Sequence, residues 1–516
     1  MALNEAQINL PDESGSHKLQ PYAGPFATMN PLTGKSGFDG GSKVRASLRA
    51  AIEESGLKDG MTITFHHHFR EGDKIISQVL ATIEEMGIRG LRFAPSAVVN
   101  LRNPSVVHFI ESGVIDRVEA SGIRGELGDA VISGAMTNPV ILRPHGGRPR
   151  AIAAGELTVD VAFIGVSAAD EYGNANGILG ENACGALGYS HVDAQYGKKV
   201  IAVTDTMVPY PCKPAVIRQE MVDMVVCLDE IGDSTLIGKG AARLTRNPRD
   251  LLIAKNTAAV IAHCGCFENG FSFQTGAGAI PIACTKYVGD FMQEKGIKAG
   301  FALGGVTSGI IELLNADLID YIEAVQSFDA VAARAMLGNS RIVECDSSRY
   351  ANPHNKGCMV NKLDIAVLGA LEVDINFNVN ILTGSSGEML GGLGGGPDVA
   401  AGAKVPIVAL PLFRGRTPSI VGRVFTLCTP GETVAAIVTE VGVALNPQHR
   451  SYDMLRASLK NSGVAIRSIE EMKHLAETVT GIPEPIRCTD RIVALVEYRD
   501  GTIIDAIRQL DKACHR

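Results

Sequence analysis

Three consecutive histidines, His66 to His68, have side chains that could bind a substrate or a metal. They follow a short apolar run, Met61 to Phe65, with the composition of a strand, and Arg70 lies two residues beyond them. Because successive side chains of a strand point to opposite faces, only His66 and His68 would share a face. No HExxH or CxxC motif lies nearby to complete a metal site. We therefore predict that His66, His68 and Arg70 hold an anionic substrate at a strand-to-helix junction, and that no metal binds.

A glycine-rich turn, Gln274 to Pro281 (QTGAGAIP), occupies the equivalent place in the second half of the chain. It lies between an expected strand and an expected helix. Glycine allows backbone N–H groups to approach a phosphate or a developing oxyanion. A tight turn without a ligand is the other interpretation. We predict that this turn, beginning with Gln274, faces the substrate from the side opposite the histidines.

The densest glycine stretch runs from Gly384 to Asp398 and has seven glycines in fifteen residues. Such a segment cannot build a core, so it is either a flexible linker or a loop that lies against a ligand. The internal repeat described below continues directly through it, which disfavours a linker. We predict a ligand-binding loop.

Two further features of the sequence, an arginine-rich turn and a glutamate, each have two interpretations. The turn from Arg143 to Arg150 (RPHGGRPR) could bind a carboxylate or could be a solvated cationic cluster. Glu268 could act as a nucleophile in acyl transfer. However, Glu268 precedes its expected strand and stands before Asn269-Gly270, a pair typical of a turn.

The elements that must position these residues are duplicated along the chain. The segment from Asp160 to Asn176 (DVAFIGVSAADEYGNAN) recurs 204 residues later, from Asp364 to Asn380, as DIAVLGALEVDINFNVN. The segments 114–120 (VIDRVEA) and 318–324 (LIDYIEA) are separated by the same 204 residues. In both halves, continuous apolar strands alternate with helical periodicity, which is typical of a parallel sheet covered on both faces. We predict two similar α/β domains with mainly parallel sheets, and a site in the cleft between them.

The expected domain organisation follows from this repeat. Residues 1–40 are rich in Gly, Pro and Ser and are predicted to form an N-terminal arm. The first domain is predicted over 41–240. The second is predicted over 241–516, with a C-terminal appendage of two helices and a hairpin that turns at 499–501.

Composition excludes several classes of protein. The net charge is −8, aromatic residues are 5% and Trp is absent, which argues against nucleic-acid binding. No apolar run reaches the roughly 18 residues that a membrane span needs. The N-terminus lacks the pattern of a signal peptide, and the 11 cysteines are scattered. We therefore expect reduced thiols and a cytoplasmic location.

Several of these segments resemble a known family. They are 274–281, 160–176, GGLGGGPDVAAGAK at 391–404, the histidine segment 65–73 and VEYRDGT at 496–502. Together with the paired halves, they resemble class I coenzyme A transferases. Over nearly its whole length the chain is most similar to one branch of that family, the α subunits of citrate lyase.

The resemblance implies a transferase reaction. The enzyme would exchange acetate for citrate on an acyl-carrier thioester, giving citryl-carrier and free acetate. It also implies an oligomeric complex with a citrate lyase β subunit, which would cleave citryl-carrier, and an acyl carrier protein (γ) subunit. No cofactor is expected on the chain itself. The carrier's phosphoribosyl-dephospho-coenzyme A group, or a coenzyme A thioester, would arrive as substrate.

The sequence departs from the wider family at the nucleophile. Class I transferases attack the thioester with a glutamate, and the two positions where their subgroups carry it align with Gly276 and Gly304. We therefore predict that a citrate carboxylate attacks the acetyl thioester and forms a mixed anhydride. The alternative is an ordinary class I coenzyme A transferase or acyl-coenzyme A hydrolase with a covalent glutamate, for which Glu268 is the candidate.

This mechanism assigns roles to the glycines. The predicted backbone donors to the oxyanion are Gly276, Gly278, Gly304 and Gly305. The predicted contacts to citrate are His66, His68, Arg70 and Gln274. The predicted contacts to the carrier arm are Gly392, Gly394, Gly395, Gly396 and Asp398.

Overall fold

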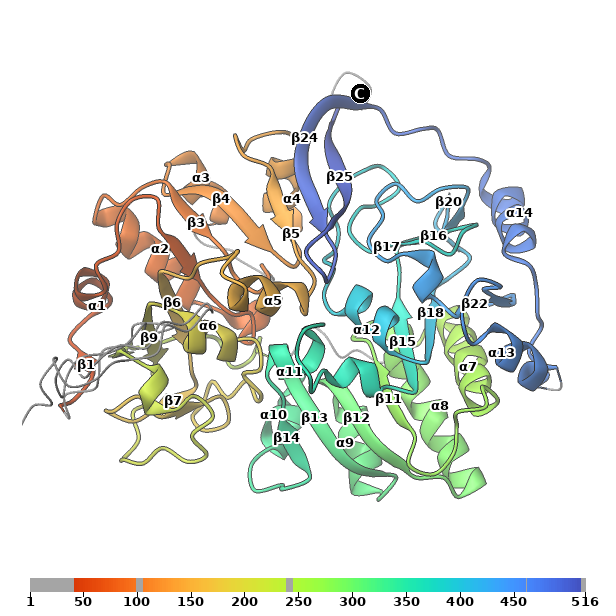
Figure 1. The fold of residues 1–516 in the computed structure, drawn as a ribbon, viewed down its shortest axis with the longest axis horizontal. Helices are drawn as coiled ribbons and strands as arrows, with labels where there is room; N and C mark the ends of the chain where they lie inside the picture. Colours follow the sequence, from red (N-terminus) through yellow and green to blue (C-terminus); the bar gives the residue numbers. More distant parts are fainter. Residues whose placement is uncertain (1–40, 99–104, 238–244, 461, 512–516) are drawn as a thin grey trace, which may run out of the picture. The chain divides into compact units, whose positions relative to one another are not determined.

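The structure is a computed structural model that describes residues 41–98, 105–237, 245–460 and 462–511 (Figure 1). The predicted N-terminal arm, residues 1–40, and the predicted boundary at residue 240 lie outside these ranges. Two large sheets, each with helices on its faces, make up most of the described chain.

The first sheet has ten strands, and its first nine run parallel. From edge to edge the strands are β1 (Val44–Arg45), β10 (Met224–Cys227), β9 (Lys199–Thr204), β6 (Val161–Gly165), β2 (Thr62–Thr64), β3 (Leu91–Phe93), β4 (Ile115–Ala120), β5 (Val140–Leu142), β24 (Cys488–Glu497) and β25 (Ile503–Leu510). Its helices are α1 (Leu48–Ser55), α2 (Ile75–Glu85), α3 (Val106–Glu111), α4 (Gly125–Ile132), α5 (Gly147–Ala153) and α6 (His191–Tyr196).

The second sheet has eight strands, and only its last pair is antiparallel. The strands are β14 (Ile342–Glu344), β13 (Ile319–Ser327), β12 (Ala299–Val306), β11 (Ser272–Thr275), β15 (Ile365–Gly369), β18 (Val405–Ala409), β22 (Ala436–Thr439) and β23 (Gly442–Leu445). Its helices are α7 (Pro248–Ala262), α8 (Ala279–Lys295), α9 (Ser308–Asn315), α10 (Ala330–Ala335), α11 (Ser347–Ala351), α12 (Gly396–Gly402), α13 (Tyr452–Leu459) and α14 (Ile469–Thr480).

Short strands lie outside the two sheets. They are β7 (Ala168–Ala169), β8 (Ala175–Asn176), β16 (Glu372–Asp374), β17 (Val379–Asn380), β19 (Phe413–Arg414), β20 (Thr417–Pro418) and β21 (Ile420–Val421). None of the helices in the described ranges is long and apolar enough to cross a bilayer.

The two sheets share one strand order, which confirms the predicted α/β duplication. The order β10-β9-β6-β2-β3-β4-β5 in the first matches β22-β18-β15-β11-β12-β13-β14 in the second. The inner strands β6 and β18 are buried along their whole length, because helices cover both faces of each sheet.

The repeat extends to single hydrogen bonds. Asp160 accepts a hydrogen bond from the backbone N–H of Thr62 at 2.8 Å, at the start of β2. Asp364 accepts one from the backbone N–H of Ser272 at 2.9 Å, at the start of β11. Each carboxylate therefore fixes the start of the central strand of its own half.

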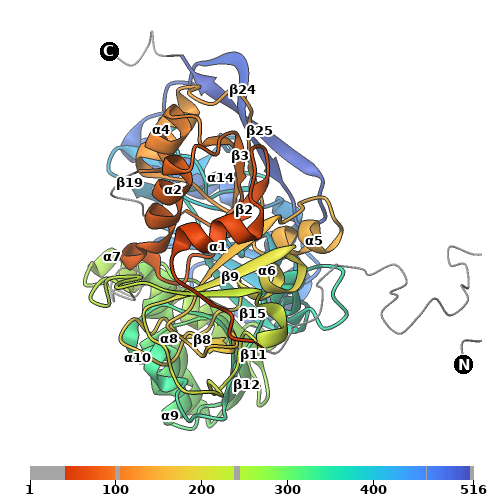
Figure 2. The ribbon, with the colours of Figure 1, turned by 90° about the vertical axis from the view of Figure 1, so that its left-hand side faces the viewer.

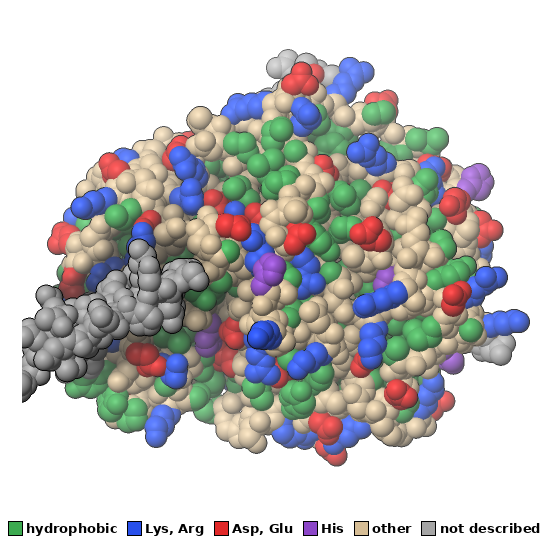
Figure 3. Space-filling view, in the orientation of Figure 1, with side chains coloured by type: hydrophobic (Ala, Val, Ile, Leu, Met, Phe, Trp, Pro, Cys, Tyr) green, Lys and Arg blue, Asp and Glu red, His purple; other side chains and the backbone are tan. Residues whose placement is uncertain are grey.

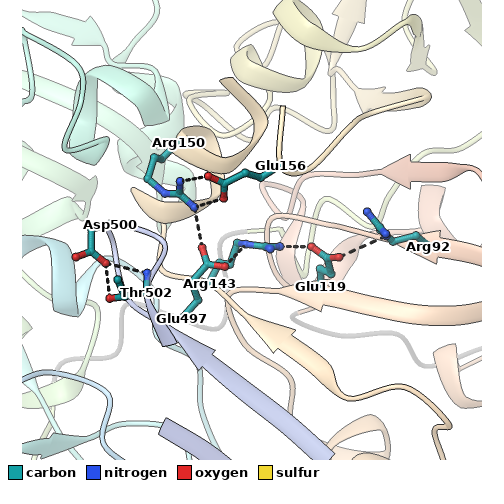
Figure 4. Close-up of polar contacts among 8 residues, drawn as sticks. All are labelled: Arg92, Glu119, Arg143, Arg150, Glu156, Glu497, Asp500 and Thr502. Atoms are coloured by element: carbon teal, nitrogen blue, oxygen red, sulfur yellow. Dashed lines mark hydrogen bonds and ion pairs between the residues drawn. The ribbon is translucent and has the colours of Figure 1, made fainter. Parts of the chain in front are cut away.

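The C-terminal hairpin corrects one expectation. It turns where the sequence predicted, but it does not extend the second half, because β24 pairs in parallel with β5 of the first sheet. Figures 1 and 2 both show the hairpin beside α4. Hairpin and sheet are joined by buried charges: Arg143 contacts Glu119 of β4 and donates to Glu497 of β24 at 2.9 Å (Figure 4). Buried charges are tolerated only when paired, so this network accompanies the packing of the hairpin's apolar side chains, among them Val493, Val496 and Ile507, against the first core.

On the face seen in Figure 3, basic and acidic side chains of the described residues are interspersed with apolar ones.

Candidate active site

A cavity of about 410 Å³ lies between the two sheets, at the carboxyl ends of β2 and β11. From the first half it is lined by His67, Arg70, Ser121, Arg124, His145 and Tyr189, among others. From the second half it is lined by Gln274, Gly276, Gly305, Gln326, Tyr350 and the loop Gly391–Gly396, among others. Both cationic side chains, Arg70 and Arg124, come from the first half. Among the described residues that line the cavity, none is Asp or Glu.

The halves meet at this cavity through two equivalent backbone contacts. Leu393 donates its N–H to the carbonyl of Ser121 at 2.7 Å, and Gly188 donates its N–H to the carbonyl of Val325 at 3.1 Å. Ser121 and Val325 are 204 residues apart, so each half inserts the same loop against the same strand end of the other. The halves also approach closely at Gly122, where a Cβ would lie 2.3 Å from the Cα of Gly392.

The histidine prediction needs a correction. His66 and His68 do share a face, with their Nδ1 atoms 2.9 Å apart, but neither lines the cavity. His66 instead contacts the carbonyl of Gly165 through Nε2 at 2.7 Å, and burial lowers its pKa to about 4. His67 is the histidine that faces the cavity. The alternation of side chains along a strand correctly predicted that His66 and His68 share a face. It could not show which face bears the site, because both faces of this strand end are buried.

Arg70 lies at the cavity as predicted. Its φ of +52° is in the left-handed region that only glycine adopts without cost, and such strain concentrates at functional sites. The guanidinium lies 4.8 Å from the centre of the Phe328 ring, and its buried Nε has no hydrogen-bond partner among the described residues. Burial lowers the pKa of Arg70 to about 10, which still leaves it cationic at neutral pH. The neighbouring carboxylate of Glu71 favours the charged form of Arg70 and pairs with the other arginine of the cavity, Arg124, at 3.5 Å.

Only two of the four predicted oxyanion donors line the cavity. Gly276 and Gly305 line it, whereas Gly278 and Gly304 do not. The N–H of Gly276 is already donated to the carbonyl of Val367 at 2.9 Å, so it has no proton left for a ligand. Gly304 has a different reason to be glycine: its φ is +102°, and a Cβ there would lie 2.8 Å from the Gln274 side chain.

The glycine loop lies at the cavity as predicted. Gly392, Gly394, Gly395 and Gly396 all line it, and a Cβ on Gly395 would lie 2.4 Å from the hydroxyl of Tyr350. The loop therefore needs glycine to pass this close to its neighbours.

Asp398 does not line the cavity. It is fully buried behind the loop, where one carboxylate oxygen accepts the N–H of Gly146 at 2.9 Å. Its other oxygen lies 3.6 Å from Nε of Arg499, in the hairpin turn. Burial raises the pKa of Asp398 to about 7. It holds the loop, the turn before α5 and the C-terminal hairpin together, which is a positioning role and not the predicted contact with the carrier arm.

Sequence reasoning included His145 only as part of the turn 143–150, and it missed the two hydroxyl side chains, Ser121 and Tyr189, that lie beside it. Tyr189 and His145 line the cavity with their Oη and Nδ1 atoms 2.6 Å apart, and Ser121 Oγ lies 3.2 Å from Nε2 of His145. Burial, with Arg148 nearby, lowers the pKa of His145 to about 3, so the ring is neutral at physiological pH. Burial raises the pKa of Tyr189, which therefore keeps its proton. For Tyr189 a signal was available, because the segment GALGYS that contains it is the counterpart in the first half of the glycine loop.

Gln274 reaches the cavity from β11, as predicted. Its amide nitrogen donates to the hydroxyl of Tyr350 at 2.9 Å, a residue that the sequence did not single out. Within the described ranges there is no group of three or more His, Cys, Asp or Glu side chains suited to a metal ion.

The paired, mainly parallel halves with a glycine-lined cavity between them define a protein of the coenzyme A transferase-like fold. A chain of a malonate decarboxylase hetero-tetramer from Pseudomonas shares this fold, with a TM-score of 0.62 over 85% of this chain and 86% of that one. At 16% identity this similarity shows the fold alone.

The narrower assignment comes from more similar proteins. The family model "Citrate lyase, alpha subunit (CitF)" matches residues 41–510. The citrate lyase alpha chain of Klebsiella pneumoniae is 46% identical over 492 residues, which are 95% of this chain and 96% of the relative. That of Escherichia coli (strain K12) is 44% identical over 468 residues, 91% of each chain. The alpha subunit of citrate lyase from Streptococcus mutans, solved in complex with citrate, has a TM-score of 0.90 at 46% identity and covers 93% of both chains. The chain belongs to the citrate lyase alpha-subunit family.

Proposed function

We propose that this chain catalyses the exchange of acetate for citrate on an acyl-carrier thioester, and that a citrate carboxylate is the nucleophile. The observation that carries the proposal is the charge of the cavity. Two arginines line it and no described lining residue is acidic. A tricarboxylate would gain charge-assisted hydrogen bonds there, and a glutamate nucleophile would have repelled it.

The two sides of the cavity suit two substrates. The first half offers Arg70, Arg124 and His67 to a polyanion. The second half offers uncharged glycine backbone, which allows a long pantetheine-like arm to lie close to the chain. Support for citrate as the polyanion comes from the Streptococcus mutans relative, which was solved with citrate bound.

In the proposed reaction, no side chain of the protein forms a covalent bond to the acyl group. A citrate carboxylate oxygen forms a bond to the acetyl carbonyl carbon, and the C–S bond breaks with its electron pair remaining on sulfur. The thiolate then attacks the citryl carbonyl of the mixed anhydride. The anhydride C–O bond breaks, and acetate leaves with the oxygen that came from citrate. The protein's task is to hold the reactants at near-attack distance, which can contribute roughly 7–11 kcal/mol.

The alternative nucleophile, Glu268, is poorly placed. It is exposed, in the turn before β11, at the opposite end of that strand from the cavity. An ordinary coenzyme A transferase or hydrolase with a covalent glutamate would need this carboxylate at the acyl carbon. We expect Glu268→Gln to retain exchange activity within about threefold, whereas a nucleophile would lose several orders of magnitude.

We further propose that the chain works within a citrate lyase complex. An acyl carrier subunit would present the thioester on its phosphoribosyl-dephospho-coenzyme A arm, and a β subunit would cleave the citryl product. The setting would be the cytoplasm, where the cysteines, which are free thiols in the described residues, stay reduced.

The direct test is an exchange assay. The full chain is incubated with acetyl-coenzyme A labelled in the acetyl group, with and without citrate. We expect labelled acetate and citryl-coenzyme A to form only when citrate is present. Acetate release that does not depend on citrate would indicate a hydrolase, and no release at all would refute the proposed function.

A further inference from the structure

Three side chains from separate elements of the first half form a hydrogen-bonded line along the cavity wall. Ser121 follows β4, His145 follows β5 and Tyr189 precedes α6. All three line the cavity, and the imidazole of His145 lies between the two hydroxyls, with Nε2 towards Ser121 and Nδ1 towards Tyr189. We refer to these residues as the hydroxyl–imidazole line.

The two distances assign the direction of donation. The separation of 2.6 Å between Tyr189 Oη and His145 Nδ1 is short for an N–H donor but usual for an O–H donor. The separation of 3.2 Å between His145 Nε2 and Ser121 Oγ is within the range of an N–H donor. A neutral imidazole has one donor and one acceptor nitrogen. Tyr189 therefore donates to Nδ1, and Nε2–H donates to Ser121.

With this direction of donation, the hydroxyl proton of Ser121 is not used within the hydroxyl–imidazole line. The Ser121 oxygen receives the N–H of His145, so its own hydroxyl proton has no partner within the line. Because Ser121 lines the cavity, a ligand oxygen can accept that proton. The two other members are held in place: the Tyr189 ring lies 4.8 Å from the ring of His67 and 4.3 Å from that of His145.

The line is also tied to the glycine loop. The backbone N–H of His145 donates to the carbonyl of Gly394 at 2.8 Å, and the carbonyl of Ser121 accepts the N–H of Leu393. The Ser121 hydroxyl therefore lies next to the segment that we assign to the acyl arm.

We propose that Ser121 is a catalytic hydrogen-bond donor to the thioester carbonyl oxygen as it becomes an oxyanion, and that His145 and Tyr189 are positioning residues that aim its proton. The proposal rests on the proposed function, since it concerns the same exchange reaction. It also supplies a hydrogen-bond donor for the oxyanion that the backbone of Gly276 cannot provide, because that N–H is already donated to the carbonyl of Val367. No proton is transferred: Ser121 keeps its hydrogen and stabilises charge that appears on the carbonyl oxygen and disappears when sulfur leaves.

The first test is kinetic, with the full chain, acetyl-coenzyme A and citrate. Ser121→Ala should lower kcat about 100-fold and change KM for citrate less than threefold, because the bond strengthens only in the transition state. Ser121→Thr, which keeps the hydroxyl, should recover part of this loss. Tyr189→Phe should lower kcat about 10-fold, because His145 can then also adopt the other tautomer.

The second test reads the tautomer directly. In the full chain labelled with ¹⁵N-histidine, we expect His145 to carry its proton on Nε2, and the Nδ1-protonated form to rise in Tyr189→Phe. His145→Gln, whose amide N–H can mimic Nε2–H, should be about 10-fold more active than His145→Asn, whose amide mimics Nδ1. A purely structural role of His145 would not produce this order.

The control variants remove a tyrosine hydroxyl and a serine hydroxyl outside the cavity. Tyr287→Phe on α8 and Ser133→Ala after α4 do not touch the cavity and should keep unaltered kinetics. Exchange in the unaltered chain together with a loss below threefold in Ser121→Ala, or with a proton on Nδ1 of His145, would overturn the proposal. No exchange in the unaltered chain would instead refute the proposed function, and with it any donor role for Ser121 in that reaction.

Discussion

The two halves of the chain build the same sheet but end their central strands with different chemistry. In both, an aspartate fixes the start of the central strand, Asp160 for β2 and Asp364 for β11. Beyond its carboxyl end, β2 is followed by histidines and Arg70, whereas β11 carries Gln274 next to its last residue and is followed by glycines. The scaffold was kept through the duplication while the strand ends diverged.

This difference accounts for an asymmetric site on a nearly symmetric frame. Each half inserts a loop into the other, but the first-half loop carries Tyr189 and the second-half loop carries glycines. Tyr189 fills space and aims His145, whereas the glycines leave room for a ligand. Duplication thus supplied two equivalent positions, and we assign one to positioning and the other to ligand binding.

The largest effect is expected from Arg70, because a cationic side chain at the cavity is what distinguishes the first half from the second. Arg70→Ala should lower kcat/KM for citrate about 10²- to 10³-fold, mainly through KM, because a carboxylate would lose its desolvated cationic partner. Arg70→Lys should lose less. Arg117→Ala, an exposed arginine of β4, is the control and should change nothing. An unaltered KM in Arg70→Ala would show that the polyanion binds elsewhere.

The buried aspartates Asp193 of α6 and Asp398 of α12 offer a matched comparison between halves. Asp193 pairs with both terminal nitrogens of buried Arg148, at 2.8 and 3.0 Å. Asp193→Asn should therefore lower the free energy of unfolding by about 3–5 kcal/mol. Asp398→Asn keeps an acceptor for Gly146 and loses only the 3.6 Å contact to Arg499, so about 1 kcal/mol is expected. Urea unfolding measures both, and equal losses would contradict this view of the two halves.

The contact between the halves can be tested at Gly122. Gly122→Ala places a methyl group 2.3 Å from the Cα of Gly392, backbone that cannot rotate away. We expect about 1–3 kcal/mol of destabilisation and a loss of exchange activity as the loop is displaced. Gly422→Ala is the control, because its Cβ would meet only the end of the Lys473 side chain at 3.6 Å. Full activity in Gly122→Ala would mean that the loop does not need this approach.

The smallest effect is the pH dependence that the first-half histidines introduce. Burial lowers the pKa of His66 to about 4, whereas in the unfolded chain it titrates near 6.5. The unfolded state therefore binds the proton first, and stability that is present above pH 6.5 is lost as the pH falls towards 4. His66 alone should contribute a loss of about 1 kcal/mol between pH 7.5 and 5.5. His66→Gln should flatten this slope in urea unfolding, and an identical slope would show that His66 has the same pKa in the folded and the unfolded chain.

Much of the fold could be predicted from the sequence, because the repeat and the apolar periodicity are properties of the chain itself. The C-terminal segment has the two predicted helices, at 452–459 and 469–480, and its hairpin turns at the predicted residues. The partner of the hairpin could not be predicted, since the contacts that join it to the first sheet, such as Glu497 with Arg143, link residues that are 354 positions apart in the sequence.

The site was predicted less completely than the fold. Glycine density located the loop at 391–396, and the position of Arg70 after a strand located the cation. By contrast, the orientation of His66 and His68, and the use of the Gly276 N–H by Val367, depend on contacts that no local pattern contains. The same is true of Ser121, His145 and Tyr189, which only the fold brings together.

The account depends on citrate, and not a protein carboxylate, attacking the thioester. A single turnover with citrate labelled with ¹⁸O in its carboxylates and unlabelled acetyl-coenzyme A tests this directly. The account predicts acetate that carries one ¹⁸O atom in the first turnover. Unlabelled acetate in that turnover, with ¹⁸O found on a glutamate of the protein, would contradict it.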